Sequence, residues 1–360
     1  MKNIKVVSFF CFILTTIILN SCKKDPVITE VENTPYVLDI GAFPEPSIAT
    51  DNPLTHRGIR LGRMLFYDKI LSRNNTQACA SCHRQEFAFN DTAKYSIGVN
   101  NLPGKRNAMS IFNMAWNTNQ FFWDGRANLL RHQSLLPIQD ELEMDETLEN
   151  VVQKLNGSYF YKTLFKNAFG TSKISSDLIS KALEQFMNSI VSNNSKYDQY
   201  LAGTYTLTPE EERGRYLFVT EYNPGFPSTS GADCMHCHGG SNFENDRYMN
   251  NGLDQDITML DIGRQAVTND AADKGKFKVV SLRNIALTAP YMHDGRFSTL
   301  EQVIDHYNLV KNSSTLDGSF QQQLPNGLQL SNSDKQALVA FLKTLTDQEL
   351  ITNPEYKNPF

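Results

Sequence analysis

The 360-residue sequence has few cysteines, no basic block and, beyond its N-terminal segment, no long hydrophobic run. Six cysteines are too few for a disulfide scaffold in a chain of this length. A net charge of −5 without a cluster of lysine and arginine argues against a nucleic-acid backbone as partner. With 40% hydrophobic and 20% charged residues, the composition also excludes a disordered or collagen-like chain. It indicates a globular protein that is long enough for two domains.

The first residues have the pattern of an export signal. Lys2 and Lys5 precede an uncharged hydrophobic run over residues 6–19, which is too short for a mature membrane helix. The segment LNSC that ends at Cys22 resembles a bacterial lipobox. We therefore expect a signal peptide over residues 1–21 and a periplasmic protein that contacts a membrane only through a lipid on Cys22. A plain signal peptide followed by an incidental cysteine is the alternative.

Four cysteines remain after this signal, and all four lie in two Cys-x-x-Cys-His motifs. The residues of the motifs are Cys79, Cys82, His83, Cys234, Cys237 and His238. Two thiols at this spacing can bond to the two vinyl groups of one haem, and the adjacent imidazole can then ligate its iron. The sequence therefore predicts two covalently bound haem c groups, with His83 and His238 as proximal iron ligands.

Three other uses of paired cysteines compete with haem attachment. Structural zinc sites also use such pairs, but they usually place them closer together than Cys79 and Cys234 lie here. A thioredoxin-like redox motif would stand in a βαβ pattern, which the sequence does not have around either motif. A disulfide between such closely spaced cysteines is geometrically awkward. Covalent haem is therefore the favoured interpretation.

The sequence contains one internal repeat around the two motifs. The segment GRMLF from Gly62 recurs as GRYLF from Gly214, each ahead of a motif. Each motif is followed by an Arg-Asn pair, an Asp-Gly-Arg tripeptide and an amphipathic helical pattern. Two such units predict two haem domains rather than a solenoid, whose repeats are shorter. The expected divisions are a linker over residues 22–50, an N-terminal haem domain over 51–203, a C-terminal haem domain over 204–346 and a tail over 347–360.

Helix signals outnumber strand signals along the chain. Ser175 and Ser176 precede one helical pattern as candidate N-caps, and Ser333 precedes another. The run TPEE from Thr208 has the form of a capping box with proline at the first helical position. The segment Ser313–Gln329, rich in Ser, Asn, Gln and Gly, is expected to be a surface loop. We therefore expect a mainly α-helical fold with long loops wrapped around the haems.

Four segments together resemble the bacterial di-haem cytochrome c peroxidase family, which includes the MauG-like enzymes. The segments are LGRMLFYDKILSRNNTQACASCH, GKRNAMSIFNMAWNTNQFFWDGR, LTPEEERGRYLF and SLRNIALTAPYMHDGRFSTLEQVIDHY. Their joint order is highly specific, and the resemblance runs from about Asp51 to Leu345. It implies two cytochrome c-like haem domains packed against each other.

The resemblance implies a role for each half of the chain. The haem on His83 would be the peroxidatic one, and the haem on His238 would receive electrons. Trp123 matches the tryptophan that lies between the two haems of the family. Gln133 and Glu143 match the distal pair over the peroxidatic iron. A carboxylate there can move a proton between the two oxygens of peroxide, and an amide can orient them.

The resemblance also implies a calcium ion at the domain interface. The residues that match its oxygen ligands, which suit a hard cation, are Asn107, Thr288 and Pro290. Pro137 matches a residue of the loop that carries the distal pair. On pattern alone, Glu143 would belong to a solvated acidic face, Gln133 to a helix surface and Trp123 to the core.

The sequence departs from the family pattern after the first motif. Many members carry a histidine there that caps the peroxidatic iron until reduction releases it, whereas the matching position in this chain is Val99. Because valine cannot ligate iron, we expect the first haem to be five-coordinate and open to peroxide. The residues that remain as alternative caps are Met109, Met114, His132 and Met144.

A second departure concerns the electron-entry haem. Peroxidases of the family usually have methionine as its sixth ligand, and the matching position, counted from His293, is Tyr307. A phenolate lowers the potential of the iron, whereas methionine raises it. Tyrosine at this position resembles the MauG-like pattern. His306 and Met292 are alternative ligands.

These features lead to a di-haem c-type peroxidase as the expected function. It would reduce hydrogen peroxide to water with electrons from a small c-type cytochrome or another periplasmic donor. One alternative is a MauG-like oxidase that uses peroxide to oxidise a partner protein. Another is a non-catalytic di-haem electron carrier, against which the position of Val99 argues. A homodimer is compatible with the resemblance, because family members often dimerise.

Overall fold

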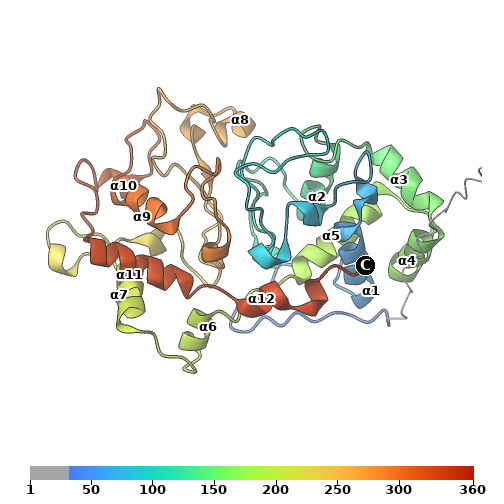
Figure 1. Ribbon diagram of the computed structural model, residues 1–360, viewed down its shortest axis with the longest axis horizontal. Helices are drawn as coiled ribbons and strands as arrows, with labels where there is room; N and C mark the ends of the chain where they lie inside the picture. Colours follow the sequence, from blue (N-terminus) through green and yellow to red (C-terminus); the bar gives the residue numbers. More distant parts are fainter. Residues whose placement is uncertain (1–31) are drawn as a thin grey trace, which may run out of the picture. The chain divides into compact units, whose positions relative to one another are not determined.

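The computed structural model describes residues 32–360, whose helices are shown in Figure 1. The expected signal peptide over residues 1–21, the lipidation site Cys22 and the start of the expected linker lie outside the described residues. Within residues 32–360, no helix combines the length and the apolar character that crossing a bilayer requires.

Helices and long connecting segments make up most of the described chain. The helices are α1 (His56–Tyr67), α2 (Leu130–Gln139), α3 (Leu148–Gly157), α4 (Tyr159–Phe169), α5 (Ser176–Ser189), α6 (Lys196–Leu201), α7 (Pro209–Val219), α8 (Gln265–Thr268), α9 (Leu300–Asn308), α10 (Gly318–Gln321), α11 (Asn332–Lys343) and α12 (Gln348–Thr352). Residues 32–360 contain a single sheet, in which β1 (Tyr248–Met249) pairs antiparallel with β2 (Phe277–Lys278). The prediction of a mainly α-helical fold is confirmed.

The helix starts follow the predicted caps with one exception. Ser175 caps α5, and the capping box between Thr208 and Glu211 opens α7. The prediction of Ser333 as an N-cap is wrong, because α11 begins earlier and is capped by Ser331, whose side chain accepts from the amide of Asp334 at 3.1 Å. Several serines in this stretch had equal capping chemistry, so the pattern did not distinguish them.

The segment Ser313–Gln329 lies mostly at the surface, as its polar composition predicts, but it is not a loop throughout. It contains helix α10, and its residues Leu316 and Gln323 are only 3% and 4% exposed. Phe320 of α10 stacks on Tyr307 of α9, with 5.8 Å between the ring centroids. A few large side chains therefore fasten this segment against α9.

The internal repeat corresponds to a repeated helix crossing. Helix α1 packs on α5 in the first half of the chain, and α7 packs on α11 in the second (Figure 1). Gly62 of α1 lies against the backbone carbonyl of Ala182, and Gly214 of α7 lies in the same way against that of Ala337. A Cβ atom at either glycine would overlap the facing carbonyl oxygen. Glycine at these positions therefore permits the close approach of the helices.

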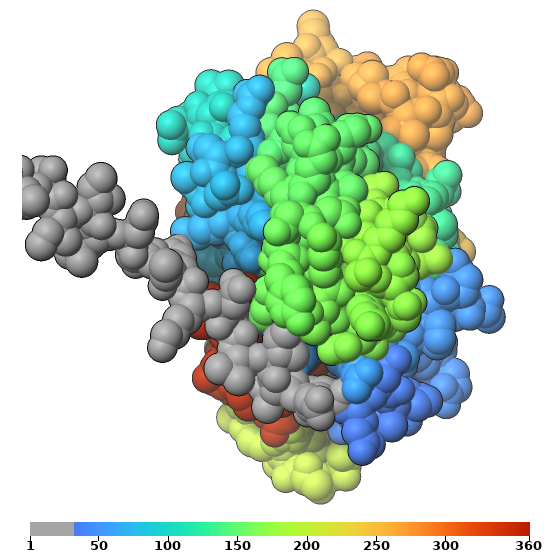
Figure 2. Space-filling view, turned by 90° about the vertical axis from the view of Figure 1, so that its right-hand side faces the viewer, coloured from blue at the N-terminus to red at the C-terminus, as the bar shows by residue number. Residues whose placement is uncertain are grey.

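Aromatic side chains fill the core beside each crossing. The ring centroids of Phe66 and Phe186 lie 5.3 Å apart in the first half, and those of Phe218 and Phe341 lie 5.1 Å apart in the second. All four side chains are buried. Helices α3 and α4 (green) cover the face of the first half that Figure 2 presents. The two halves are thus built on the same packing unit and differ in the segments around it.

We expect Gly62→Ala and Gly214→Ala each to lower the free energy of unfolding by about 1–3 kcal/mol, because the new methyl group must push two packed helices apart. Gly157→Ala is the matched control. Gly157 ends α3 with open space around it, and alanine there should be neutral or stabilise by up to about 1 kcal/mol. Denaturant unfolding of the three variants measures the difference, and equal effects at all three positions would contradict the close-packing explanation.

Candidate functional site

One cavity brings together the haem-attachment, catalytic and calcium residues that the sequence predicts. It has a volume of about 1160 Å³ and is lined by segments of both halves of the chain. This volume exceeds the roughly 300–1,000 Å³ of an ordinary small-molecule site, so it has room for more than one ligand. The predicted residues that line it are Cys79, Cys82, His83, Asn107, Trp123, Gln133, Pro137, Glu143, Cys234, Cys237, His238, Thr288, Pro290 and Tyr307.

Each Cys-x-x-Cys-His motif folds into a tight turn at the wall of this cavity. The motifs begin with 3-10 turns over Cys79–Ser81 and Cys234–His236. The amide of each motif histidine donates to the carbonyl of the first cysteine, at 3.0 Å for His83 and 2.9 Å for His238. Burial raises the pKa of the Cys234 thiol to about 12, so this thiol is protonated at neutral pH. Each turn thus presents two thiols and one imidazole to the cavity.

The two motif histidines are oriented by backbone carbonyls. Nδ1 of His83 lies 3.0 Å from the carbonyl oxygen of Phe89, and Nδ1 of His238 lies 3.2 Å and 3.1 Å from those of Phe243 and Val280. A carbonyl can only accept, so Nδ1 carries the proton and Nε2 keeps its lone pair. Burial lowers the pKa of both imidazoles, to about 4 for His238. Both are therefore in the neutral form that binds iron.

The alternatives to haem find no support at these motifs. All four cysteines are free, which argues against disulfides. Within residues 32–360, no cluster of three or more His, Cys, Asp or Glu side chains is arranged to hold a metal ion, so a zinc site lacks its ligands. The two-stranded sheet is not a thioredoxin-like βαβ unit. The donor set, two thiols and one neutral imidazole at each motif, fits covalent haem c.

The predicted distal pair lies on α2 and on the turn that follows it. Pro137 is part of α2 rather than of a loop, which corrects the expectation from the family pattern. Gln133 lies one helical turn before it. The turn that carries Glu143 is fixed by a hydrogen bond from its amide to the carbonyl of Asp140, at 2.9 Å. Burial raises the pKa of Glu143 to about 7, helped by Asp140 and opposed by Arg126.

The loop after the first motif is attached to this same turn. The amide of Val99 donates to the carbonyl of Glu143 at 2.8 Å. Gly98 lies so close to the carbonyl of Leu142 that a Cβ atom there would overlap it. Val99 itself does not line the large cavity. Of the alternative caps, Met109, Met114 and Met144 line the cavity, whereas His132 is exposed on α2 and does not.

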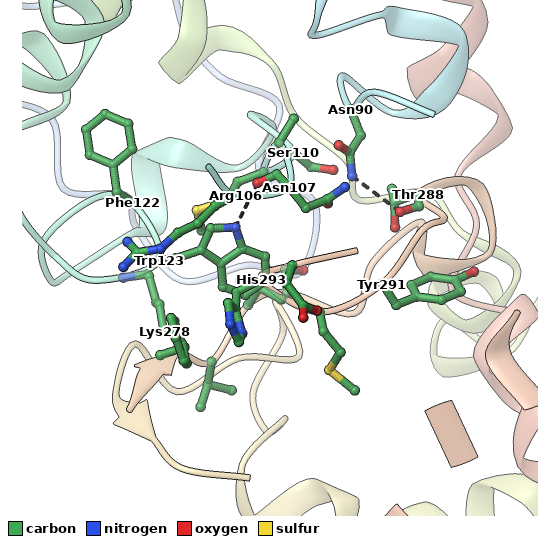
Figure 3. Close-up of a pocket in the computed structure, with 18 of the residues that line it drawn as sticks. Asn90, Arg106, Asn107, Ser110, Phe122, Trp123, Lys278, Thr288, Tyr291 and His293 are labelled. Atoms are coloured by element: carbon green, nitrogen blue, oxygen red, sulfur yellow. Dashed lines mark hydrogen bonds between the residues drawn. The ribbon is translucent and has the colours of Figure 1, made fainter. Parts of the chain in front are cut away.

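Trp123 lies in the part of the cavity where segments from both halves meet (Figure 3). Its indole Nε1 donates to the carbonyl of Asn107 at 2.9 Å. Its own carbonyl accepts from the amide of Lys278 in β2, at 2.8 Å. The side chain is therefore held from the first half and its backbone from the second.

Tyr307 lines the cavity near the second motif. Its hydroxyl accepts from the Nδ2 of Asn251 at 3.1 Å, and burial raises its pKa to about 12. Met292 also lines the cavity, and its sulfur lies 3.6 Å from the same amide nitrogen. His306 does not line the cavity, and its Nε2 donates to the carbonyl of Asn251 at 3.1 Å. Tyr307 and Met292 are thus better placed than His306 to reach a haem at this motif.

The predicted calcium residues lie where the two halves meet. Nδ2 of Asn107 donates to the carbonyls of Ala93 and Lys94, at 3.2 Å in both cases, so its side-chain oxygen remains available. The carbonyl of Thr288 lies 3.5 Å from Nδ2 of Asn90 (Figure 3). Amide and carbonyl oxygens of this kind suit a hard cation.

One polar network at the cavity was missed by the sequence analysis. Nε and Nη2 of Arg106 donate to the two carboxylate oxygens of Asp261, at 2.7 Å and 2.9 Å, and Nη1 pairs with Asp124 at 2.5 Å. Nε2 of His293 lies 4.0 Å from Asp261. Arg106 and Asp124 belong to the repeated Arg-Asn and Asp-Gly-Arg motifs, and this repetition could have marked them as candidate site residues. Asp261 lies in a connecting segment without a recognisable motif.

The sequence is similar to known proteins over most of its length. The family model for di-haem cytochrome c peroxidase matches residues 56–206. The methylamine utilization protein MauG of Methylorubrum extorquens is 33% identical over 307 residues, which cover 84% of this chain and 82% of that protein. A cytochrome c551 peroxidase of Nitrosomonas europaea is 33% identical over 302 residues, which cover 83% of this chain and 81% of that protein.

Solved structures show the same fold. A MauG-like protein associated with microbial copper homeostasis has a TM-score of 0.81 at 34% identity, covering 90% of this chain and 99% of that one. The diheme peroxidase BthA of Burkholderia thailandensis has a TM-score of 0.70 at 21% identity, covering 89% of this chain and 94% of that one, and this likeness concerns the fold alone.

Proposed function

Because the chain belongs to the di-haem cytochrome c peroxidase family and is therefore a di-haem peroxidase, we propose that its specific reaction is the reduction of hydrogen peroxide by a small c-type cytochrome or a similar donor. The observation that carries the proposal is the buried carboxyl of Glu143, which lines the cavity of the first motif together with Gln133 and has a pKa near neutrality. A general acid–base residue works best with such a pKa.

The haem irons, when bound, supply the redox chemistry that breaks the oxygen–oxygen bond. His83 and His238 would hold them through Nε2, while Nδ1 of each imidazole keeps its proton and donates it to a backbone carbonyl. Glu143 takes the proton from one peroxide oxygen and returns it to the other, and Gln133 orients the bound molecule. Trp123, which lines the cavity where segments of both halves meet, would lie between the two haems. One peroxide consumes two electrons and two protons and yields two water molecules.

Glu143→Gln should lower peroxide turnover by about 10²–10⁴-fold while both haems stay attached, because the amide cannot accept a proton. Turnover of the wild type should fall as the pH drops through about 7, where the carboxylate becomes protonated. Glu141→Gln, a change at an exposed neighbour, is the control and should leave turnover intact. Stopped-flow turnover against a reduced c-type cytochrome measures this, and near-normal rates for Glu143→Gln would remove its role.

A second candidate function is MauG-like oxidation of a partner protein. It is favoured by Tyr307 at the position where the family's peroxidases usually have methionine, since a phenolate ligand lowers the potential of the second haem. A low potential suits the sharing of oxidising equivalents between the haems better than the storage of electrons. We propose Tyr307 as the sixth ligand of that haem.

If Tyr307 ligates the second iron, Tyr307→Met should raise the potential of that haem by on the order of 0.1 V or more, within the range of about 0.8 V that axial ligands cover. His306→Gln is the control, because His306 donates to a backbone carbonyl and lies outside the cavity lining. A spectroscopic redox titration of both variants provides the measurement. An unchanged potential in Tyr307→Met would point to Met292 or His306 as the ligand.

We also propose a calcium site, domain boundaries and a cellular location for this enzyme. We place a calcium ion on oxygens of Asn107, Thr288 and Pro290, supported by their common position in the cavity wall. We assign the haem domains to residues 51–203 and 204–346, and the protein to the periplasm with a lipid on Cys22. A homodimer is compatible with this setting. An electron carrier without catalysis is disfavoured, because the residue at position 99 cannot ligate iron.

A further inference from the structure

The partly buried carboxyl of Glu244 lines the cavity and has no role in the chemistry described above. Glu244 follows the second motif, and its amide donates to the carbonyl of Gly239 at 3.0 Å. Its Oε1 accepts from Nδ2 of Asn242 at 2.6 Å. Among residues 32–360, the structure gives its carboxyl no partnering cation within ion-pair distance. The carboxyl is therefore held in place by a neutral amide and faces the cavity of the second haem.

Within the described part of the chain, no cation pairs directly with Glu244, and the nearby charge of Lys278 only partly offsets the effect of burial on its pKa. Nζ of Lys278 in β2 pairs with Asp246 at 2.9 Å instead, and the guanidinium of Arg283 pairs with Asp198 at 2.8 Å. The charged groups packed around this segment are Asp246 and Arg247 of the segment itself, Lys278 and Arg283. Burial raises the pKa of Glu244 to about 7, and Asp246 adds to the effect. Burial also tends to raise the pKa of Asp246, but the neighbouring charge of Lys278 holds that pKa below its usual range.

The internal repeat shows that this carboxyl is specific to the second half. Phe89 and Phe243 occupy equivalent positions, because the carbonyl of each accepts from Nδ1 of a motif histidine. The next residue is Asn90 in the first half and Glu244 in the second, and both line the cavity. Asparagine cannot titrate. The residue that follows the histidine-binding phenylalanine therefore carries a neutral amide in the first half and a carboxyl in the second.

We propose that Glu244 is a proton-binding site coupled to electron entry at the second haem. Glu244 takes up one proton from solvent when that haem accepts one electron from the donor, and it releases the proton when the electron leaves. No bond to the iron forms or breaks in this step. A buried carboxylate opposes added negative charge in a low-dielectric site, and protonation removes that opposition. The inference rests on the proposed role of the second haem as the site of electron entry.

Redox titrations of the holoprotein at several pH values test this coupling without peroxide. At a fixed applied potential, the ratio of reduced to oxidised second haem should fall up to tenfold for each unit by which the pH rises through the neutral range. For a one-electron couple, a tenfold change in this ratio corresponds to a shift of about 59 mV in the potential. Glu244→Gln should remove this pH dependence, and Glu244→Asp should keep it with a shifted pH range. The infrared difference spectrum of reduced minus oxidised wild type should contain a protonated carboxyl band that Glu244→Gln lacks.

Asp246→Asn is the matched control, because Lys278 keeps Asp246 ionised. It should retain the pH dependence but move it to lower pH, because it removes a negative charge that raises the pKa of Glu244 and frees Lys278 from its ion pair. A wild-type potential that is independent of pH, or an unchanged slope in Glu244→Gln, would overturn the proposal. Because these titrations contain no peroxide, they test the proton coupling separately from the peroxidase activity. An inactive protein can still show the pH-dependent potential, and an active peroxidase can lack it.

Discussion

The orientation of two imidazoles by backbone carbonyls is the constraint around which the rest of the site is arranged. Phe89 and Phe243 supply those carbonyls, and both side chains are buried. Phe89 packs on Phe66 with ring centroids 6.3 Å apart, and Phe243 packs on Phe218 at 6.0 Å. These partners belong to α1 and α7, the glycine-containing helices of the two crossings. In each half, one phenylalanine thus links the tight helix packing to the position of the proposed iron ligand.

The two halves share this helix packing and histidine orientation, but they differ in the residues that face the proposed haems. Near the first motif, the turn after α2 carries the Glu143 carboxyl and also holds the loop with Val99 through a backbone hydrogen bond. Near the second, α9 carries Tyr307, and α10 covers its ring with Phe320. We therefore assign an open coordination position to the first iron and a protein ligand to the second. Trp123 lies in the cavity that both sites share.

The sequence could predict the features that depend on short, rigid spacings. The haem motifs, the helical fold and the caps of α5 and α7 follow from local sequence patterns. The residues Trp123, Gln133 and Glu143 and the calcium residues, in contrast, followed only from the resemblance to the family. It could not predict helix α10 or the burial of Leu316 and Gln323 within the polar segment Ser313–Gln329, or choose between Ser331 and Ser333 as a cap. Glu244 was missed because its environment arises from β2 and from the cavity, which lie far from it in the sequence. Its equivalence to Asn90 depends on the hydrogen bonds from the motif histidines to Phe89 and Phe243, because Asn90 and Glu244 lie at different distances in sequence from those histidines.

The central claim is that the first iron keeps an open position while the second does not. Electron paramagnetic resonance of the resting ferric protein, recorded without prior reduction, tests it most directly. We expect a high-spin component from the first haem together with a low-spin signal from the second. Two purely low-spin signals would mean that a side chain occupies the first iron permanently, and they would contradict the peroxidase mechanism derived from this structure.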